Sequence, residues 1–219
     1  AKAAEEALHI PYDNVFVAST GVIGKQLPID RIVAGTKVLA GKLDGSIEAG
    51  TDAAKAIMTT DTKKKEIAVS MLLGDKEVTL GGMCKGSGMI HPNMCTMLGF
   101  VTTDANISKE MLQKAVSASV VDSFNMISVD GDTSTNDTLL VLANGLAGNK
   151  EITVEDADFN AFCEALDYVT MYLAKKMAGD GEGATALFEC QVVGADTKEN
   201  ARTLAKSVIC SSLSKAAIF

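Results

Sequence analysis

Aromatic residues and prolines are scarce in this sequence. It contains no tryptophan, aromatic residues make up 5% of it, and proline occurs three times in 219 residues. These shortages argue against a core built on large aromatic side chains and predict an aliphatic core rich in alanine and valine. With 47% hydrophobic and 22% charged residues, the composition is typical of a globular chain with one substantial core or two small domains.

Positive charge is also in short supply. Lys and Arg number 20 against 28 Asp and Glu, which leaves a net charge of −8. Because phosphate binding requires clustered Lys and Arg, this balance argues against nucleic acid and against a membrane surface as partners. An exposed turn between a helix and a strand explains the one dense basic run, Lys63-Lys64-Lys65. No apolar run approaches the roughly 20 residues of a membrane span.

The residues that commonly bind metals do not cluster. The five cysteines lack the C-x-x-C spacing, and the two histidines, His9 and His91, are far apart in sequence. We therefore expect no zinc site and no resident cofactor. Cys163 and Cys210 occupy apolar positions of predicted helices, where buried thiols are expected. The opening residues, AKAAEEALHI, are helical and charged, unlike a signal peptide, so we expect a reducing, cytoplasmic location.

Helical and extended patterns alternate along the chain without repeats or a Pro- or Ser-rich linker. The patterns predict helices over residues 1–8, 30–43, 46–58, 109–124, 155–177 and 198–215. They predict strands over residues 14–18, 66–73, 77–80, 98–102, 126–129, 138–143 and 184–193. A hairpin turn at Gly74-Asp75 joins two of these strands, and Thr138 to Ala143 is apolar enough to be covered on both faces. Hairpins mixed with crossovers indicate an α+β layered fold rather than a Rossmann-type winding.

The most unusual stretch runs from Gly81 to Asp104 and reads GGMCKGSGMIHPNMCTMLGFVTTD. Four of its glycines surround a single lysine, Lys85, and supply the backbone freedom that close approach to a ligand requires. After a proline turn, Cys95-Thr96 opens an apolar run. A hydroxyl at the mouth of a strand is well placed to act as a nucleophile. The plain alternative is a glycine-rich loop followed by a buried strand.

The segment KGSGMIHPNMCTML closely resembles the processing site of the ornithine acetyltransferase family, also called glutamate N-acetyltransferase (ArgJ). Members of that family resemble N-terminal-nucleophile hydrolases and cut their own precursor immediately before a threonine. The resemblance implies cleavage between Cys95 and Thr96, although Cys95 stands where alanine is usual. One domain of the ArgJ/DmpA-like type would then consist of an α-chain portion, residues 1–95, and a β-chain portion, residues 96–219. Thr96 would supply both the attacking hydroxyl and, through its α-amine, the base.

A second segment, Ser19-Thr20-Gly21-Val22-Ile23-Gly24, interrupts the chain between two predicted elements. Acyl transfer develops negative charge on a carbonyl oxygen and requires hydrogen-bond donors aimed at it. A threonine hydroxyl and a glycine amide can donate in this way, but on the residues alone a turn at a helix entry is the preferred interpretation. The segment resembles the family's oxyanion hole, which implies that role for Thr20 and Gly21.

Two further residues acquire substrate-binding roles from the resemblance. Lys85 is either solvated or meets a substrate carboxylate as a point charge. It precedes Thr96 by eleven residues, the spacing of the family's substrate-contacting lysine. Thr59, in IMTTDT, corresponds to the family's substrate-contacting threonine. Lys63-Lys64 stand where an aromatic-proline pair is common in that family.

Acidic residues supply the remaining candidates. Glu182, in GEGATALFEC, either lies in a turn or, as in the family's GEGAT motif, stands beside the α-ammonium of the nucleophile and the amino group of the substrate. Asp130-Gly131-Asp132 with Asp137 could form a Ca²⁺ or Mg²⁺ loop. No glutamate occupies the twelfth position, however, so hydrogen-bonded turns are the preferred interpretation. We interpret His91 as a residue of a proline turn rather than a catalytic base.

The implied reaction is acetyl transfer from N-acetylornithine through an acetyl-threonine to glutamate, in arginine biosynthesis. Some members also use acetyl-CoA as donor, and the two pieces of the precursor pair and assemble further, as a heterotetramer. Family members are longer at both ends, so the resemblance implies a fragment. Two alternatives stay open: an N-terminal-nucleophile aminopeptidase or amidase, and an inactive, unprocessed fragment.

Overall fold

A computed structural model describes residues 1–91 and 97–219, which form two compact units, Ala1–Ala53 and Ala54–Phe219. The first unit contains α1 (Lys2–Leu8), the 3₁₀ turn η1 (Tyr12–Asn14), α2 (Ile29–Ala40) and the beginning of α3 (Ile47–Ala56). Helix α1 packs against α2, and no residue of this unit is buried. The predicted strand 14–18 is wrong. Its Phe16 and Val17 stay exposed, because no strand among the described residues pairs with them.

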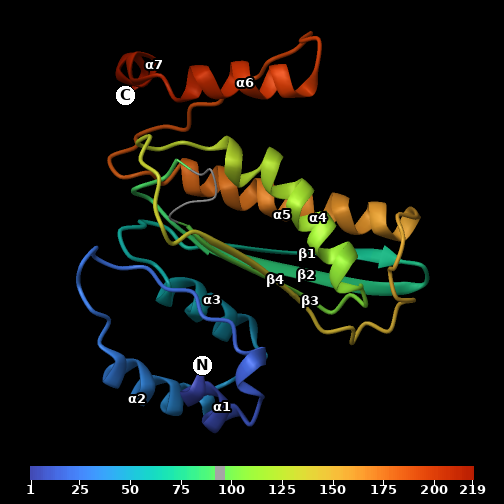
Figure 1. The fold of residues 1–219 in the computed structure, drawn as a ribbon. Helices are drawn as coiled ribbons and strands as arrows, with labels where there is room; N and C mark the ends of the chain where they lie inside the picture. The colour runs from blue at the N-terminus through green and yellow to red at the C-terminus, as the bar shows by residue number, and fades with distance from the viewer. Residues whose placement is uncertain (92–96) are drawn as a thin grey trace. The chain divides into compact units, whose positions relative to one another are not determined.

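The second unit is built on a four-stranded sheet (Figure 1). Its strands are β1 (Lys65–Leu73), β2 (Lys76–Lys85), β3 (Leu98–Thr103) and β4 (Thr138–Ala143), in the order β1-β2-β3-β4. The first three strands run antiparallel, and β4 runs parallel to β3. The predicted hairpin is confirmed, with Gly74 at φ 61° in the turn. Because antiparallel and parallel pairs occur in one sheet, the predicted α+β class is also confirmed.

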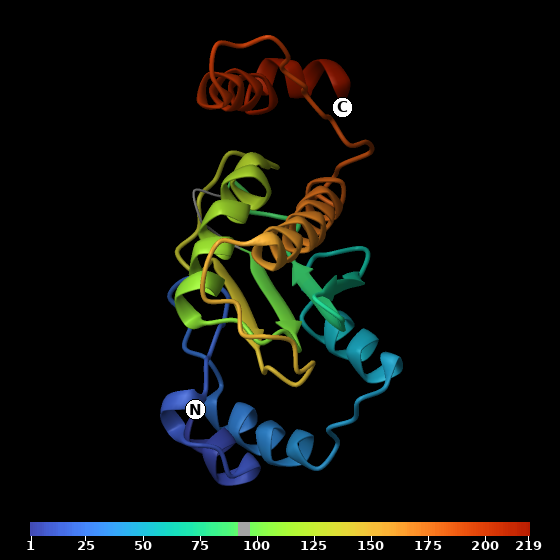
Figure 2. The same ribbon diagram turned by 90° about the vertical axis from the view of Figure 1, so that its right-hand side faces the viewer.

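Helices α4 (Lys109–Asp122) and α5 (Ala157–Ala178) lie side by side on one face of this sheet (Figures 1 and 2). The hydroxyl of Ser108 accepts the N–H of Met111 and caps α4, as the sequence predicts. Alternate side chains of β1 and β2, such as Leu73 and Leu80, are buried against α5. The opposite side of β1 is exposed at Leu72, so the sheet buries one face most completely.

The strand register gathers four chain segments at one end of the sheet. Lys65, which begins β1, pairs with Cys84 near the end of β2. Lys85 then pairs with Leu98, the first residue of β3, and Leu98 pairs in turn with Thr138, the first residue of β4. The segments before β1, after β2, before β3 and before β4 therefore meet at this end, which holds the candidate site.

Three other sequence predictions fail in this unit. Residues 126–129 form no strand, because the chain passes through the 3₁₀ turn η2 (Phe124–Met126) instead. Residues 184–193 have strand-like composition but pair with no described strand. Strand β4 is half-buried rather than covered on both faces, because it lies at the edge of the sheet. Each failure concerns the pairing of a strand with another strand or the burial of a strand under other elements. Both depend on distant parts of the chain.

The predicted C-terminal helix consists of two helices, α6 (Lys198–Ile209) and α7 (Ser212–Ile218). Ser211 starts the second by accepting the N–H of Ser214. The guanidinium of Arg202 in α6 forms a bidentate ion pair with Asp122 at the end of α4. These two helices, η2, α5 and the segment 183–191 line a mainly apolar cavity of about 850 Å³.

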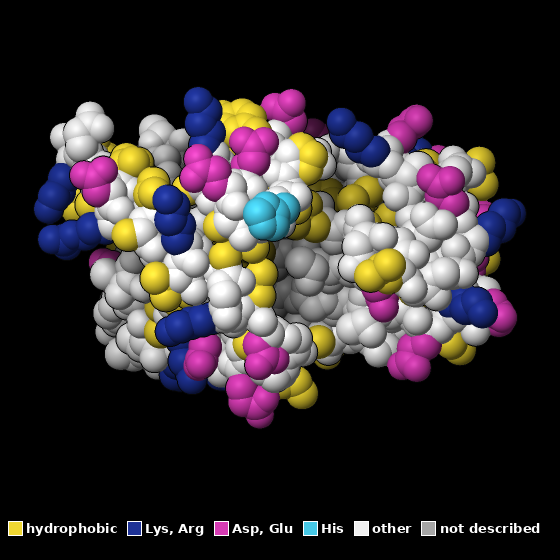
Figure 3. Space-filling model, turned by 90° about the horizontal axis from the view of Figure 1, so that it is seen from below, with side chains coloured by type: hydrophobic (Ala, Val, Ile, Leu, Met, Phe, Trp, Pro, Cys, Tyr) yellow, Lys and Arg dark blue, Asp and Glu magenta, His cyan; other side chains and the backbone are white. Residues whose placement is uncertain are grey.

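The surface mixes charges of both signs. On the face drawn in Figure 3, Lys and Arg side chains and Asp and Glu side chains are both spread across the surface, with hydrophobic side chains among them. Among the described residues, none of the helices combines the length and the apolar character that a membrane span requires.

Candidate functional site

The predicted nucleophile Thr96 and its neighbour Cys95 lie outside the described residues, but the residue that follows them is held firmly. The backbone N–H of Met97 donates to Oδ1 of Asp137, and its carbonyl accepts the N–H of Thr138 at 2.9 Å. Two consecutive residues before and within β4 thus fix the entry to β3.

The acidic loop over residues 130–137, which contains Asp137, also binds the chain at residues 89 and 90. Asp130 accepts the backbone N–H groups of Met89 at 2.5 Å and Ile90 at 3.0 Å. Asp130 also accepts the N–H of Asp132, two residues on, at 3.1 Å, which confirms the predicted hydrogen-bonded turn at this residue. Among the described residues, no cluster of His, Cys, Asp and Glu has the arrangement of a metal site.

The Asp137 carboxylate has an unusual environment. Its Oδ2 atom is buried and has no hydrogen-bond partner among the described residues. Burial raises the pKa of this carboxyl to about 7, although the Met97 N–H and the positive charge of Lys85 both act to lower it. Asp137 is thus an acid that titrates near neutral pH beside the start of β3.

Lys85 ends β2 at this site and is only 5% exposed, so the solvated alternative is wrong. A buried ammonium group is poised to interact with a carboxylate, because it has lost most of its water. Its neighbour Cys84 is not a competing nucleophile: burial raises the pKa of that thiol to about 12.

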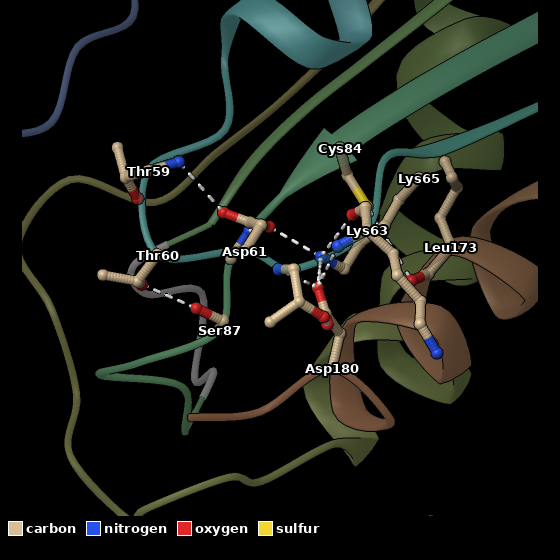
Figure 4. Close-up of polar contacts among 11 residues, drawn as sticks. Thr59, Thr60, Asp61, Lys63, Lys65, Cys84, Ser87, Leu173 and Asp180 are labelled. Carbon is tan, nitrogen blue, oxygen red and sulfur yellow. Dashed lines mark hydrogen bonds and ion pairs between the residues drawn. The ribbon is translucent and has the colours of Figure 1, made fainter. Parts of the chain in front are cut away.

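Thr59 and Thr60 lie in the exposed segment that leads into β1. The hydroxyl of Thr60 is 2.6 Å from the hydroxyl of Ser87, in the glycine-rich segment after Lys85. The N–H of Thr59 donates to the carboxylate of Asp61 at 3.2 Å. The structure thus joins the predicted threonine segment to the predicted lysine segment (Figure 4).

Glu182 approaches the glycine-rich segment from the end of α5. Its N–H donates to the carbonyl of Ser87 at 2.8 Å. Its carboxylate lies so close to Gly88 that a Cβ atom there would be 2.6 Å from Oε1. The side chain itself is exposed. Glu182, Lys85 and the Thr59–Thr60 segment therefore converge on residues 86–88.

A buried ionic cluster lies beneath these segments (Figure 4). The ammonium group of Lys65 is 2.6 Å from Asp61 Oδ1 and 2.5 Å from Asp180 Oδ2. Burial raises the pKa of both carboxyls, but the Lys65 ammonium and donated backbone N–H groups outweigh it, so both pKa values end below the ordinary range. Both aspartates are therefore charged at neutral pH.

Sequence reasoning missed this cluster. The basic run was interpreted as an exposed turn, which fits Lys63 and Lys64 but is wrong for Lys65, whose side chain is 1% exposed. The available signal was the alternation of β1, which turns Lys65 to the same side as Ile67 and Val69. A lysine in phase with the core side of a strand requires a buried anionic partner.

The oxyanion-hole candidates belong to the other unit. Thr20 is half-buried and Gly21 is exposed, in a segment without regular structure. The oxyanion-hole role of Thr20 and Gly21 stays a prediction.

The structure also places three other residues that the sequence singled out, His91, Cys163 and Cys210. His91 Nδ1 is 2.9 Å from the Ser128 hydroxyl, and burial together with the charges of Lys206 and Lys215 lowers its pKa. The interpretation of His91 as a turn residue rather than a catalytic base stays a prediction. Cys163 and Cys210 are only half-buried, so the prediction of fully buried thiols is wrong.

Comparison with known proteins identifies relatives along the entire chain. The sequence profile of the ArgJ family matches residues 1–219. A protein of Symbiobacterium thermophilum named "Arginine biosynthesis bifunctional protein ArgJ" is 55% identical over 219 residues, which are 100% of this chain and 54% of that protein. "Arginine biosynthesis bifunctional protein ArgJ 1" of Clostridium acetobutylicum is 53% identical over 97% of this chain and 52% of its own length.

A solved structure is similar as well. The crystal structure of the arginine biosynthesis bifunctional protein argJ from Bacillus halodurans has 50% sequence identity and a TM-score of 0.53. The match covers 54% of this chain and 56% of that one. The chain spans about half the length of the curated relatives that it matches.

Proposed function

Because this chain belongs to the ArgJ family, we propose that it supplies the nucleophile and part of the substrate site of an acetyltransferase of arginine biosynthesis. One observation supports the proposal most. Lys85, the Thr59–Thr60 segment and Glu182 converge on residues 86–88, at the end of the sheet where β3 begins, two residues after Thr96 in the sequence. A cation, hydroxyls and a carboxylate in this region match what an N-acetylated amino acid offers: a carboxylate, an acyl group and an amine.

The proposed reaction has two acyl-transfer steps. The Thr96 hydroxyl attacks the acetyl carbon of N-acetylornithine while the Thr96 α-amine takes its proton. The bond from the acetyl carbon to nitrogen then breaks, and ornithine leaves as the proton passes to its nitrogen. In the second step the amine of glutamate attacks the acetyl-threonine, which releases N-acetylglutamate and restores the Thr96 hydroxyl. Acetyl-CoA is a second donor to be tested.

The side chains have distinct proposed roles. Lys85 binds the substrate α-carboxylate, and desolvation makes this charge pair selective for amino acids over neutral amides. Glu182 orients the ammonium groups of Thr96 and of the substrate. Thr59 contacts the substrate, and Thr20 and Gly21 stabilise the oxyanion.

Formation of the free Thr96 amine requires cleavage between Cys95 and Thr96. Asp130 holds the N–H groups of Met89 and Ile90 on one side of this segment, and Asp137 holds that of Met97 on the other. Fixed flanks reduce the conformations that the peptide between them can adopt, which favours an intramolecular attack. The resulting pieces, residues 1–95 and 96–219, would remain paired and assemble as a heterotetramer.

Cleavage is tested first, by the intact mass of the purified, denatured chain. Two species, ending at Cys95 and starting at Thr96, are expected in place of one species of 22.8 kDa. Thr96→Ala should give the single uncut species. Normal cleavage of that variant would overturn the proposed self-processing.

Acetyl transfer is tested in a hybrid in which these 219 residues replace the matching segment of the Symbiobacterium thermophilum relative. We expect consumption of N-acetylornithine and glutamate-dependent formation of N-acetylglutamate, with acetyl-CoA tried as donor in a parallel arm. Release of amines from peptides or amides without an acceptor would instead identify an aminopeptidase or amidase.

A further inference from the structure

Three charged residues of the site region have no role in the proposed chemistry. Asp61, Lys65 and Asp180 bury their charged groups almost completely, with side-chain exposures of 0%, 1% and 6%. They come from the segment before β1, the start of β1 and the end of α5. No substrate can reach groups this buried without opening the fold, so their function has to be exerted through their neighbours.

Asp61 holds two segments of the site. One of its oxygens, Oδ1, accepts the Lys65 ammonium at 2.6 Å and the backbone N–H of Gly86 at 2.7 Å. The other, Oδ2, accepts the N–H of Thr59 at 3.2 Å. This single carboxylate therefore fixes the backbone of the threonine segment relative to the backbone that follows Lys85.

Asp180 holds the third segment. Its carboxylate accepts the Lys65 ammonium at 2.5 Å and the backbone N–H groups of Thr62 at 3.1 Å and Lys63 at 3.3 Å. The Thr62 hydroxyl donates to it as well. Asp180 precedes Glu182 by two residues, so this contact ties the segment that carries Glu182 to the segment that carries Thr59.

We propose that the Asp61–Lys65–Asp180 cluster is the positioning element of the substrate site, which sets the spacing of the segments that carry Thr59, Lys85 and Glu182. The proposal rests on the proposed function for the roles of those three residues. The cluster suits this task because its contacts are directional. Backbone N–H groups donated to a carboxylate fix both distance and orientation, which apolar packing alone does not.

The charges of the cluster predict which variants will fold. Two carboxylates share one ammonium group, so removal of Lys65 leaves two buried negative charges without a counterion. Removal of one aspartate instead leaves a balanced pair of one anion and one cation. Asp61→Ala and Asp180→Ala are therefore the informative variants, and each should remain folded.

Hydrogen exchange at single amides tests the positioning directly. In Asp61→Ala, the amides of Gly86 and Thr59 should exchange at least about tenfold faster than in the unchanged chain. In Asp180→Ala, the amides of Thr62 and Lys63 should exchange faster by the same factor. Amides in the middle of β2 and α5 should keep their protection in both variants.

Kinetics in the hybrid protein then test the consequence for the substrate. Both variants should raise the KM for N-acetylornithine by about tenfold and lower kcat by less than about threefold, because binding groups are displaced while Thr96 is untouched. Glu66→Ala is the matched control. It also replaces a paired carboxylate by alanine, but in a pair with Lys64 nearer the surface, and should change neither quantity.

The exchange and kinetic results together distinguish a positioning role from a purely structural role and from a failure of the proposed function. Segment-specific exchange with a raised KM supports the positioning role. Unchanged exchange at all four amides, or equal loss of protection throughout β2 and α5, would overturn it in favour of no role or a purely structural one. An inactive unmodified hybrid would overturn the proposed function, and the exchange pattern would still decide whether the cluster positions these segments.

Discussion

The carboxylate of Glu182 occupies the space that a side chain on residue 88 would need. A Cβ atom at Gly88 would lie 2.6 Å from Oε1 and 2.7 Å from the carboxyl carbon of Glu182. Non-bonded heavy atoms attract best at about 3.5–4.0 Å, so glycine is the residue that leaves this carboxylate in place. The absence of a side chain at position 88 is thus part of the geometry of Glu182.

This relationship makes Gly88→Ala a probe of Glu182. The new methyl group should displace the carboxylate by about 1 Å and lower kcat/KM for N-acetylornithine by about 10- to 100-fold in the hybrid protein. The free energy of unfolding should change by less than about 0.5 kcal/mol, because Glu182 is exposed and can move aside. Steady-state kinetics and urea unfolding measure the two effects.

A double-mutant cycle with Glu182→Ala isolates the mechanism. If Gly88→Ala acts by moving Glu182, it should have little further effect once that carboxylate is gone. An equal loss of kcat/KM in both backgrounds would show that the methyl group acts on something else.

The fold could be predicted from the sequence where a pattern is local. Extended patterns predict β1, β3 and the first part of β2, but β2 continues through Gly81 and Gly82 to Lys85, where the glycine-rich pattern indicates a loop. The Ser108 hydroxyl predicts the start of α4. The same extended patterns misassigned residues 14–18 and 184–193. Whether an extended segment becomes a strand depends on a partner, and neither segment pairs with a described strand.

The candidate site also combines residues that a local motif predicts with residues that depend on distant contacts. Lys85, Thr59 and Glu182 came from motifs, and the structure brings their segments together. The alternation of β1 indicates that Lys65 is buried, but its partner Asp180 could not be predicted, because it lies 115 residues away in the sequence. Long-range ionic contacts leave no periodicity for a sequence pattern to reveal.

The neighbouring glycines Gly81 and Gly82 should respond differently to alanine. A Cβ atom at Gly82 would lie 3.0 Å from Val169 and 3.1 Å from Leu173, both fully buried in α5. At Gly81 the nearest atom would be 3.9 Å away. Gly82→Ala should therefore be less stable than Gly81→Ala by about 1–3 kcal/mol, because α5 is packed directly on β2 at residue 82.

Urea unfolding of the two variants at one pH checks this difference. Gly81→Ala is the control, because it makes the same change one residue away on the other face of the strand. Equal midpoints would show that α5 can shift to admit the methyl group and that the packing over Gly82 is loose.

Cysteine reactivity should follow burial. Burial raises the pKa of Cys84 to about 12 and that of Cys163 to about 11, so neither forms an appreciable amount of thiolate at neutral pH. Cys84, which is also fully buried, should be alkylated by iodoacetamide most slowly of the four cysteines that the structure describes. Mass spectrometry of peptides from a time course gives the order, and early modification of Cys84 would contradict its burial at the end of β2.

Asp137 should make stability depend on pH near neutrality. Its pKa is raised to about 7 in the folded chain from an ordinary value of 3.8, chiefly by burial. Between these values the folded state binds more protons than the unfolded state, so the free energy of unfolding should fall as pH rises through this window. Above about pH 7 the carboxylate is charged in the fold, and its stabilising contribution is lost. Urea unfolding at pH 5, 6, 7 and 8 measures the slope.

Asp137→Asn should remove this component of the slope, because its amide cannot ionise, while its oxygen can still accept the N–H of Met97. The stability of the original chain relative to the variant should decline between pH 5 and about pH 7 and level off towards pH 8. Asp132→Asn, an exposed change in the same loop, is the control, and its profile should run parallel to that of the original chain. Parallel profiles for Asp137→Asn as well would mean that Asp137 stays ionised throughout this range. Its Oδ2 atom, which has no hydrogen-bond partner in the part of the chain that the structure describes, would then require a cation or a hydrogen-bond donor beside it.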